Sequence, residues 1–180
     1  MEFAILHAIQ SLRSPELDIA MVFFSHLGDH GLIWIAMAFG LLAFEKTRLI
    51  GKVTAMSIIV EIITVTLLLK PLINRVRPCA YETLSDPLVS VCYTDPSFPS
   101  GHTAVAFAFA SALFFMNRRW GLVALLCAAL MGFTRLYMFV HFPSDVAAGA
   151  VIGTVIGFIC YRLYQRYEAL KKQSSKPLES

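Results

Sequence analysis

Apolar residues along this chain gather into five long runs that almost lack charge. The runs lie at residues 31–44, 53–69, 103–116, 120–134 and 146–161, and each holds 14 to 17 residues. As helices they would cover roughly 21 to 26 Å, slightly less than the ~30 Å hydrocarbon core of a bilayer. We therefore expect membrane helices whose flanking polar residues lie at headgroup depth.

Two weaker segments precede these runs. Residues 15–28 predict a further membrane helix, because Ser14 can cap it and Pro15 suits its first position. In residues 1–12 the apolar side chains recur at helical spacing, which is typical of an amphipathic helix on a membrane surface, although a frayed terminus explains it equally well. The predicted fold is all-α: a six-transmembrane-helix bundle with an N-terminal amphipathic helix.

Turns and charges divide the chain further. The expected membrane helices cover about residues 15–28, 31–45, 52–69, 100–116, 120–139 and 143–166. Residues 1–166 would form a single membrane-embedded domain with its main polar motifs within residues 70–145. Residues 167–180 would form a polar tail in the cytoplasm, with disorder expected at residues 171–176. No cleavable signal is expected, since Glu2 stands where a signal peptide would begin with basic residues.

Composition agrees with a membrane protein, and the distribution of charge orients it. Of the 180 residues 57% are apolar and 15% are charged, whereas soluble domains carry about a quarter charged residues. The net charge of +3 is too small to indicate a nucleic-acid partner. In this topology eleven basic residues share one side, and four face the other: Lys70, Arg75, Arg77 and Arg135.

The positive-inside rule places the eleven-base side in the cytoplasm. We therefore expect a multi-pass protein of the cell membrane with both termini cytoplasmic. The loop at residues 70–99 and the stretch at 134–145 would face outward. Four basic residues on the disfavoured side suggest a bound anion.

Three polar clusters lie at the outward ends of these helices. The first holds Lys70 and Arg77, a point charge and a planar fork that together suit the oxygens of a phosphate. Arg75 between them could be only a snorkelling residue. The second is Pro99-Ser100-Gly101-His102, where a helix start presents backbone N–H groups and His102 can donate a proton.

The third cluster holds Arg135, His141 and Asp145. An imidazole four residues ahead of a carboxylate allows Asp145 to hold the ring in one tautomer and leaves the other nitrogen free to attack. A buried His–Asp pair is often only structural. The match in character among the three clusters favours chemistry.

Together the clusters resemble the signature of the type 2 phosphatidic acid phosphatase superfamily, a family of membrane lipid phosphatases. The family pattern is Lys, six residues, Arg-Pro; then Pro-Ser-Gly-His; then Ser-Arg, five residues, His, three residues, Asp. All three parts match in order and spacing, except that Thr134 replaces the usual Ser and keeps its hydroxyl.

The resemblance implies a role for each residue. His141 would attack phosphorus to form a phosphohistidine, Asp145 would orient it, and His102 would act as general acid and then general base. The phosphate would be bound by Lys70, Arg77, Arg135 and the amides of Ser100 and Gly101. Metal ligation by the two histidines and the aspartate is an alternative, but the surrounding cations oppose a divalent ion, so we expect no metal and no cofactor.

The resemblance favours a lipid phosphate substrate presented from the bilayer, with undecaprenyl diphosphate as the leading candidate. Phosphatidylglycerophosphate, phosphatidic acid and lipid A phosphates are alternatives. A lipid phosphotransferase would use the same motifs, and an anion transporter would account for the charges but not for the paired histidines. The sequence does not indicate an oligomeric state.

A few other residues need an interpretation. Glu61 lies mid-membrane and is expected to bond a neighbouring helix. Cys79 and Cys92 share the outward loop and could form a disulfide. Small residues in the last helix favour close packing within the bundle, with a dimer as the alternative. His26, Asp29 and His30 could rim the site, although a plain turn also explains them.

Overall fold

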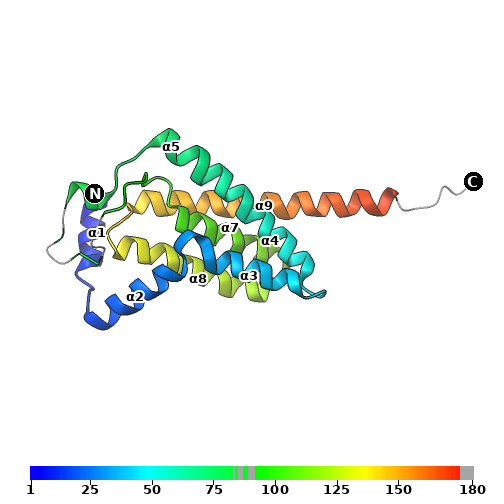
Figure 1. Cartoon of the computed structure of the whole chain (residues 1–180), viewed down its shortest axis with the longest axis horizontal. Helices are drawn as coiled ribbons and strands as arrows, with labels where there is room; N and C mark the ends of the chain where they lie inside the picture. Colours follow the sequence, from blue (N-terminus) through cyan, green and yellow to red (C-terminus); the bar gives the residue numbers. More distant parts are fainter. Residues whose placement is uncertain (83, 85–86, 89–91, 175–180) are drawn as a thin grey trace, which may run out of the picture.

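The structure, a computed structural model, describes residues 1–82, 84, 87–88 and 92–174 of the chain. Within these residues it is all-α, with no strand. The long helices run side by side along the long axis of the molecule (Figure 1). They are α3 (Leu32–Ala43), α4 (Arg48–Glu61), α7 (Gly101–Met116), α8 (Arg118–Tyr137) and α9 (Pro143–Ser174).

The bundle has two distinct ends. The loop end holds α1 (Glu2–Gln10), α5 (Lys70–Ile73), residues 92–100 and the turn between α8 and α9. The hairpin end holds the α3–α4 and α7–α8 turns, and α9 projects past it (Figure 1). A π-helix, η2 (Ile62–Leu69), continues α4 toward the loop end, and α6 (Pro78–Tyr81) follows α5.

Fewer helices are long and apolar enough to span a membrane than the hydrophobic runs predict. Among the described residues, three helices are long and apolar enough to cross a bilayer: Arg48–Tyr81, Arg118–Tyr137 and Pro143–Ser174. The pair made of α2 (Pro15–Leu27) and residues Asp29–Ala43 qualifies as one bent span, and α7 is a shorter apolar helix. Six crossings are therefore not confirmed.

The predicted hairpin between residues 15–28 and 31–45 is wrong. The two helices meet at a bend of 46°, whereas two antiparallel crossings would need a turn close to 180°. The junction contains a short 3-10 turn, η1 (Asp29–Gly31), with positive φ at His30 (53°) and Gly31 (71°). This turn redirects the chain without reversing it. The predicted cap is confirmed, since the Ser14 side chain accepts a hydrogen bond from the Leu17 amide.

Helix α1 and the end of α9 consequently lie at opposite ends of the bundle (Figure 1). Helix α1 packs at the loop end, where Leu6 contacts Phe139 and Phe142 in a small buried cluster. The Glu2 carboxylate accepts a 2.6 Å hydrogen bond from Arg75. The expectation that both termini are cytoplasmic stays a prediction; if the bent pair is one span, α1 lies on the side of the membrane opposite the end of α9. The expected helix at residues 1–12 forms, but it packs on protein, and its membrane-surface role stays a prediction.

Three glycines let α9 approach α7 closely, which fixes the start of α7 within the bundle. A Cβ atom on Gly149 would lie 2.7 Å from the Ser100 carbonyl oxygen, and one on Gly153 would lie 2.3 Å from that of Ala104. Real Cβ atoms do not approach so closely, and Gly157 is enclosed in the same way. The small residues therefore serve packing within the bundle, as the preferred interpretation held.

The Cys79–Cys92 disulfide is present and closes a segment with a sequence separation of 13. A loop of this size gains about 3 kcal/mol from such closure. The bond anchors the chain directly before Tyr93 and Asp95, which line the site described below.

The predicted polar tail is partly wrong, because α9 continues through residues 167–174 to Ser174. Glu, Ala, Leu and Lys in that stretch are strong helix formers, so the helix extends beyond the apolar run. Residues 175–180 lie outside the described part of the chain.

Candidate active site

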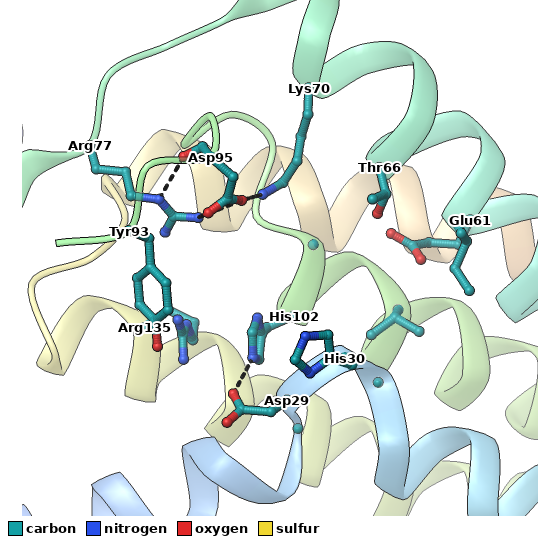
Figure 2. Close-up of a pocket in the computed structure, with 15 residues that line it drawn as sticks. Asp29, His30, Glu61, Thr66, Lys70, Arg77, Tyr93, Asp95, His102 and Arg135 are labelled. Carbon is teal, nitrogen blue, oxygen red and sulfur yellow. Dashed lines mark hydrogen bonds and ion pairs between the residues drawn. The ribbon is translucent and has the colours of Figure 1, made fainter. Parts of the chain in front are cut away.

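A cavity of about 430 Å³ opens at the loop end of the bundle. Its walls come from η1, η2, α7, α8 and the segment after the disulfide (Figure 2). Five of the eight residues predicted for the site line it: Lys70, Arg77, Gly101, His102 and Arg135. The other three, Ser100, His141 and Asp145, are buried behind its wall.

An aspartate occupies the place between the two cations of the first cluster (Figure 2). The Asp95 carboxylate lies 2.5 Å from the Lys70 ammonium nitrogen, and Arg77 Nη2 donates to its two oxygens at 2.9 and 3.0 Å. Partial burial acts to raise the pKa of Asp95, but the bond from Lys70 and the charge of Arg77 outweigh it and lower that pKa. An ionised carboxylate thus lies where the sequence predicts a phosphate.

His141 has a defined tautomer. Its Nε2 lies 3.0 Å from Arg77 Nη1, and a guanidinium can only donate, so Nε2 carries the lone pair. The proton is therefore on Nδ1, which lies 3.3 Å from the Ser97 hydroxyl and 3.5 Å from Asp145 Oδ2. Burial and then the Arg77 charge lower the pKa of His141 below its ordinary value, against the opposite effect of Asp145. A neutral ring that keeps its lone pair on Nε2 suits a nucleophile.

Asp145 acts on His141 partly through a bridging hydroxyl. Ser97 donates a short hydrogen bond to Asp145 Oδ2, and the Phe142 amide donates to the same oxygen at 2.8 Å. The other oxygen accepts a 2.6 Å bond from Arg75. The structure thus gives Arg75 a role that the snorkelling interpretation missed, because it supplies the positive charge beside a fully buried carboxylate.

Arg135, the third cation of the cavity, has hydrogen-bond partners for only part of its guanidinium group. Arg135 is 1% exposed, and its Nη1 donates to Ser25, but its Nε has no partner among the described residues. The Tyr93 ring lies within 5.0 Å of the Arg77 guanidinium and 5.7 Å of that of Arg135. Buried N–H groups are seldom left unpaired, so Arg135 offers a donor to an anion in the cavity.

His102 faces the cavity from the first turn of α7. Its Nε2 lies 3.0 Å from Asp29 Oδ1, and the other Asp29 oxygen lies 2.8 Å from Nδ1 of His26. A carboxylate can only accept, so Nε2 of His102 carries a proton and Nδ1 is the nitrogen left for chemistry. From the sequence we expected Asp29 only in a plain turn or at the rim of the site.

Ser100 and Glu61 make different contacts from those that the sequence predicts. The Ser100 amide donates to the Asp145 carbonyl at 3.1 Å, so in this conformation it joins α7 to α9 and does not face the cavity. Glu61 lines the cavity, and its Oε1 has no partner among the described residues, so the predicted bond to a neighbouring helix is wrong for that atom. Glu61 is the last residue of α4, and it faces the cavity together with Ile62 and Thr66 of η2.

Tyr93, Asp95 and Ser97 were not predicted from the sequence. They lie in the irregular segment after the disulfide, where hydropathy gives no signal and no family motif points to them. The five prolines and two aspartates of residues 70–99 indicated only that this loop is polar and irregular.

Comparisons with known proteins agree on one family. A family model described as the PAP2 superfamily matches residues 48–169. The undecaprenyl-diphosphatase BcrC of Bacillus subtilis is 31% identical over 168 residues, which cover 90% of this chain and 83% of that protein.

Two solved structures share the architecture. LpxE of Aquifex aeolicus superposes with a TM-score of 0.75 and 32% identity, covering 89% of this chain and 94% of that one. A PAP2-type phosphatidylglycerolphosphate phosphatase of Bacillus subtilis gives a TM-score of 0.74 with 26% identity, covering 91% and 84%.

Proposed function

The chain belongs to the PAP2 superfamily and is a membrane lipid phosphatase, and from that premise we propose that it hydrolyses a lipid diphosphate through a phosphohistidine at His141. The leading substrate is undecaprenyl diphosphate, which would yield undecaprenyl phosphate and inorganic phosphate. The reaction would take place at the extracytoplasmic face of the cell membrane.

The observation that carries this proposal is the position of Asp95. Its carboxylate is held on one side of the Arg77 fork, and the lone pair of His141 Nε2 lies against the other nitrogen of the same fork. A phosphoryl group that displaced the carboxylate would meet the same cations. It would then lie next to the nucleophilic nitrogen.

The chemistry follows in two balanced steps. In the first, His141 Nε2 attacks phosphorus, the bond from phosphorus to the leaving oxygen breaks, and His102 Nδ1 gives that oxygen a proton. In the second, His102 Nδ1 takes a proton from water as the water oxygen attacks phosphorus. The P–N bond breaks, and its electron pair returns to Nε2.

Charge stabilisation in both steps would come from the cavity wall. Lys70 and Arg77 would bind equatorial oxygens of the transferred group, and the open Nε–H of Arg135 would bind a further oxygen. A diphosphate brings more negative charge to these three cations than a monoester does. This supports a diphosphate over phosphatidic acid.

The charge distribution supports the outward orientation. The loop end carries five basic residues, Arg13, Lys70, Arg75, Arg77 and Arg135, one more than expected because Arg13 moves there with the N-terminus. The larger set lies at the hairpin end and along the projecting part of α9: Lys46, Arg48, Lys52, Arg118, Arg119, Arg162, Arg166, Lys171 and Lys172. The positive-inside rule would place the hairpin end in the cytoplasm.

Phosphatidylglycerophosphate is the second candidate, because one structural neighbour is a phosphatidylglycerolphosphate phosphatase. Lipid A phosphates and phosphatidic acid are further members of the same substrate class.

Phosphate release by the purified protein tests the proposal. Undecaprenyl diphosphate, phosphatidylglycerophosphate and phosphatidic acid would be compared in the same detergent, with and without a chelator, and with His141→Ala as the blank. We expect fastest release from the diphosphate, unaffected by the chelator. Transfer of phosphate to a second lipid would instead indicate a phosphotransferase, and transport without hydrolysis in vesicles would indicate a transporter.

A further inference from the structure

The turn that joins α2 to α3 is built against the acid–base histidine. A Cβ atom on Gly28 would lie 2.5 Å from the methyl carbon at the flexible end of Met131 and 3.3 Å from Cδ2 of His102, so the turn lies directly against the ring. The positive φ angles at His30 and Gly31 then turn the chain around Asp29. The result is that Asp29 lines the cavity beside His102 (Figure 2).

The contact between the two side chains is specific. Asp29 Oδ1 lies 3.0 Å from His102 Nε2, whereas Lys70, Arg77 and the Asp95 carboxylate lie on the opposite side of the ring in Figure 2. The Asp29 carboxylate therefore holds the ring at Nε2, on the side away from these cations. The Nδ1 nitrogen then faces the place where the phosphoryl group would bind.

We propose that Asp29 is a positioning residue for His102, holding the ring so that Nδ1 serves as general acid in the first step and general base in the second. This inference rests on the proposed function, in which His102 has both tasks. With Nε2–H bound to Asp29, the neutral ring carries its lone pair on Nδ1 and can accept a proton from water. When the ring is protonated, the Asp29 charge stabilises the cation that must give its proton to the leaving oxygen.

This arrangement predicts a dependence on the leaving group. Diacylglycerol leaves phosphatidic acid as an alkoxide and needs a proton, so its departure depends on a well-placed acid. Nitrophenolate leaves 4-nitrophenyl phosphate without one. The second step uses the same phosphohistidine and the same water in both cases, and it needs the base equally.

The test compares Asp29→Asn with the unmodified full chain on these two substrates. For phosphatidic acid we expect kcat/KM to fall roughly 10- to 100-fold, a part of the 10²- to 10⁴-fold that general acid catalysis contributes. For 4-nitrophenyl phosphate we expect kcat/KM to change by less than about threefold while kcat falls, because the second step is slow. Nitrophenol should then be released in a burst of about one equivalent per enzyme.

Two further variants sharpen the result. Asp29→Glu keeps the carboxylate and is expected to recover part of the activity on phosphatidic acid. Asp18→Asn is the matched control. Asp18 is an aspartate in α2, and its carboxylate accepts hydrogen bonds from Tyr137 and Arg13 outside the cavity. It should leave both substrates unaffected.

Two results would overturn the proposal. An equal fall in kcat/KM for both substrates would overturn the proposal, because a collapsed turn would impair the site regardless of the leaving group. No change on either substrate would overturn it as well. No hydrolysis by the unmodified protein of any lipid phosphate would refute the proposed function itself, which is a different result from either of these.

Discussion

The two histidines of the site lie in opposite surroundings. The His141 side chain is 1% exposed, and both of its ring nitrogens have protein partners. The His102 side chain is 21% exposed, and among the residues that the structure describes its one hydrogen-bond partner is Asp29. A nucleophile has to be held in one geometry with its lone pair aimed at phosphorus, whereas an acid–base group has to exchange protons with water and substrate.

The difference extends to the residues behind each ring. His141 is fixed by the buried Ser97 and Asp145 and by the half-buried Arg75, which come from three separate segments of the chain. His102 is fixed by a single turn that carries Asp29. The nucleophile side should therefore be rigid and sensitive to single changes, and the acid side should be more tolerant.

The largest expected effect separates the two histidines directly. His141→Ala removes the atom that attacks phosphorus, and we expect it to lower kcat/KM on the order of 10⁴-fold or more. His102→Ala should cost roughly 10²- to 10³-fold, because only proton transfer is lost. Phosphate release from undecaprenyl diphosphate measures both. Equal losses would show that the two rings do not have different tasks.

Arg75→Gln tests the network on the nucleophile side alone. The change leaves the buried Asp145 carboxylate without its charge partner, so we expect kcat to fall roughly 10- to 100-fold and the protein to lose thermal stability. Turnover and thermal unfolding in detergent are the measurements. Arg118→Gln at the hairpin end is the control and should change neither. Wild-type turnover in Arg75→Gln would return that residue to the snorkelling interpretation.

Asp95→Asn tests whether a carboxylate competes for the phosphate position. Without the negative charge, Lys70 and Arg77 are freed for an incoming anion, so we expect inhibition by vanadate to tighten about tenfold, equivalent to ~1.4 kcal/mol. The inhibition constant of vanadate is the measurement, with Glu82→Gln in the same loop as control. Weaker vanadate binding would mean that Asp95 instead holds the cations in place.

The smallest effect is a pH dependence of stability. The pKa of His141 is lowered in the folded protein, so the folded ring stays neutral as pH drops below about 6.5. In the unfolded chain the same ring gains a proton in that range. Folding stability should therefore fall as pH drops, by about 1 kcal/mol from this group between pH 6.5 and 5.5. Thermal unfolding across this range would measure it, and His141→Gln should flatten the slope. If stability falls with pH equally in His141→Gln and in the unmodified protein, His141 gains its proton in the folded state as readily as in the unfolded chain, which would contradict the lowered pKa.

Much of this site could be predicted because its residues lie at the ends of apolar helices. Hydropathy locates those ends, and the spacing of Lys70, Arg77, His102, His141 and Asp145 matches one family pattern. The structure gathers these groups at one end of the bundle, as expected. Their individual roles stay proposals.

What could not be predicted depends on how irregular segments fold in three dimensions. Asp95 and Ser97 follow a disulfide in a loop, and Asp29 lies in a turn, so neither place has a periodic signal. The direction of the chain after Gly28 depends on two positive φ angles, and hydropathy alone could not distinguish a 46° bend from a hairpin. That single turn decides on which side the N-terminus lies.

Mapping of the phosphorylated residue tests the central claim most directly. The protein would be quenched during turnover of ³²P-labelled undecaprenyl diphosphate and digested with trypsin, which places His141 in residues 136–162, a peptide with no other histidine. The account predicts an acid-labile phosphate in that peptide, attached to Nε2 of His141. A phosphate on His102, or rapid turnover with no phosphoenzyme in any quench, would contradict it.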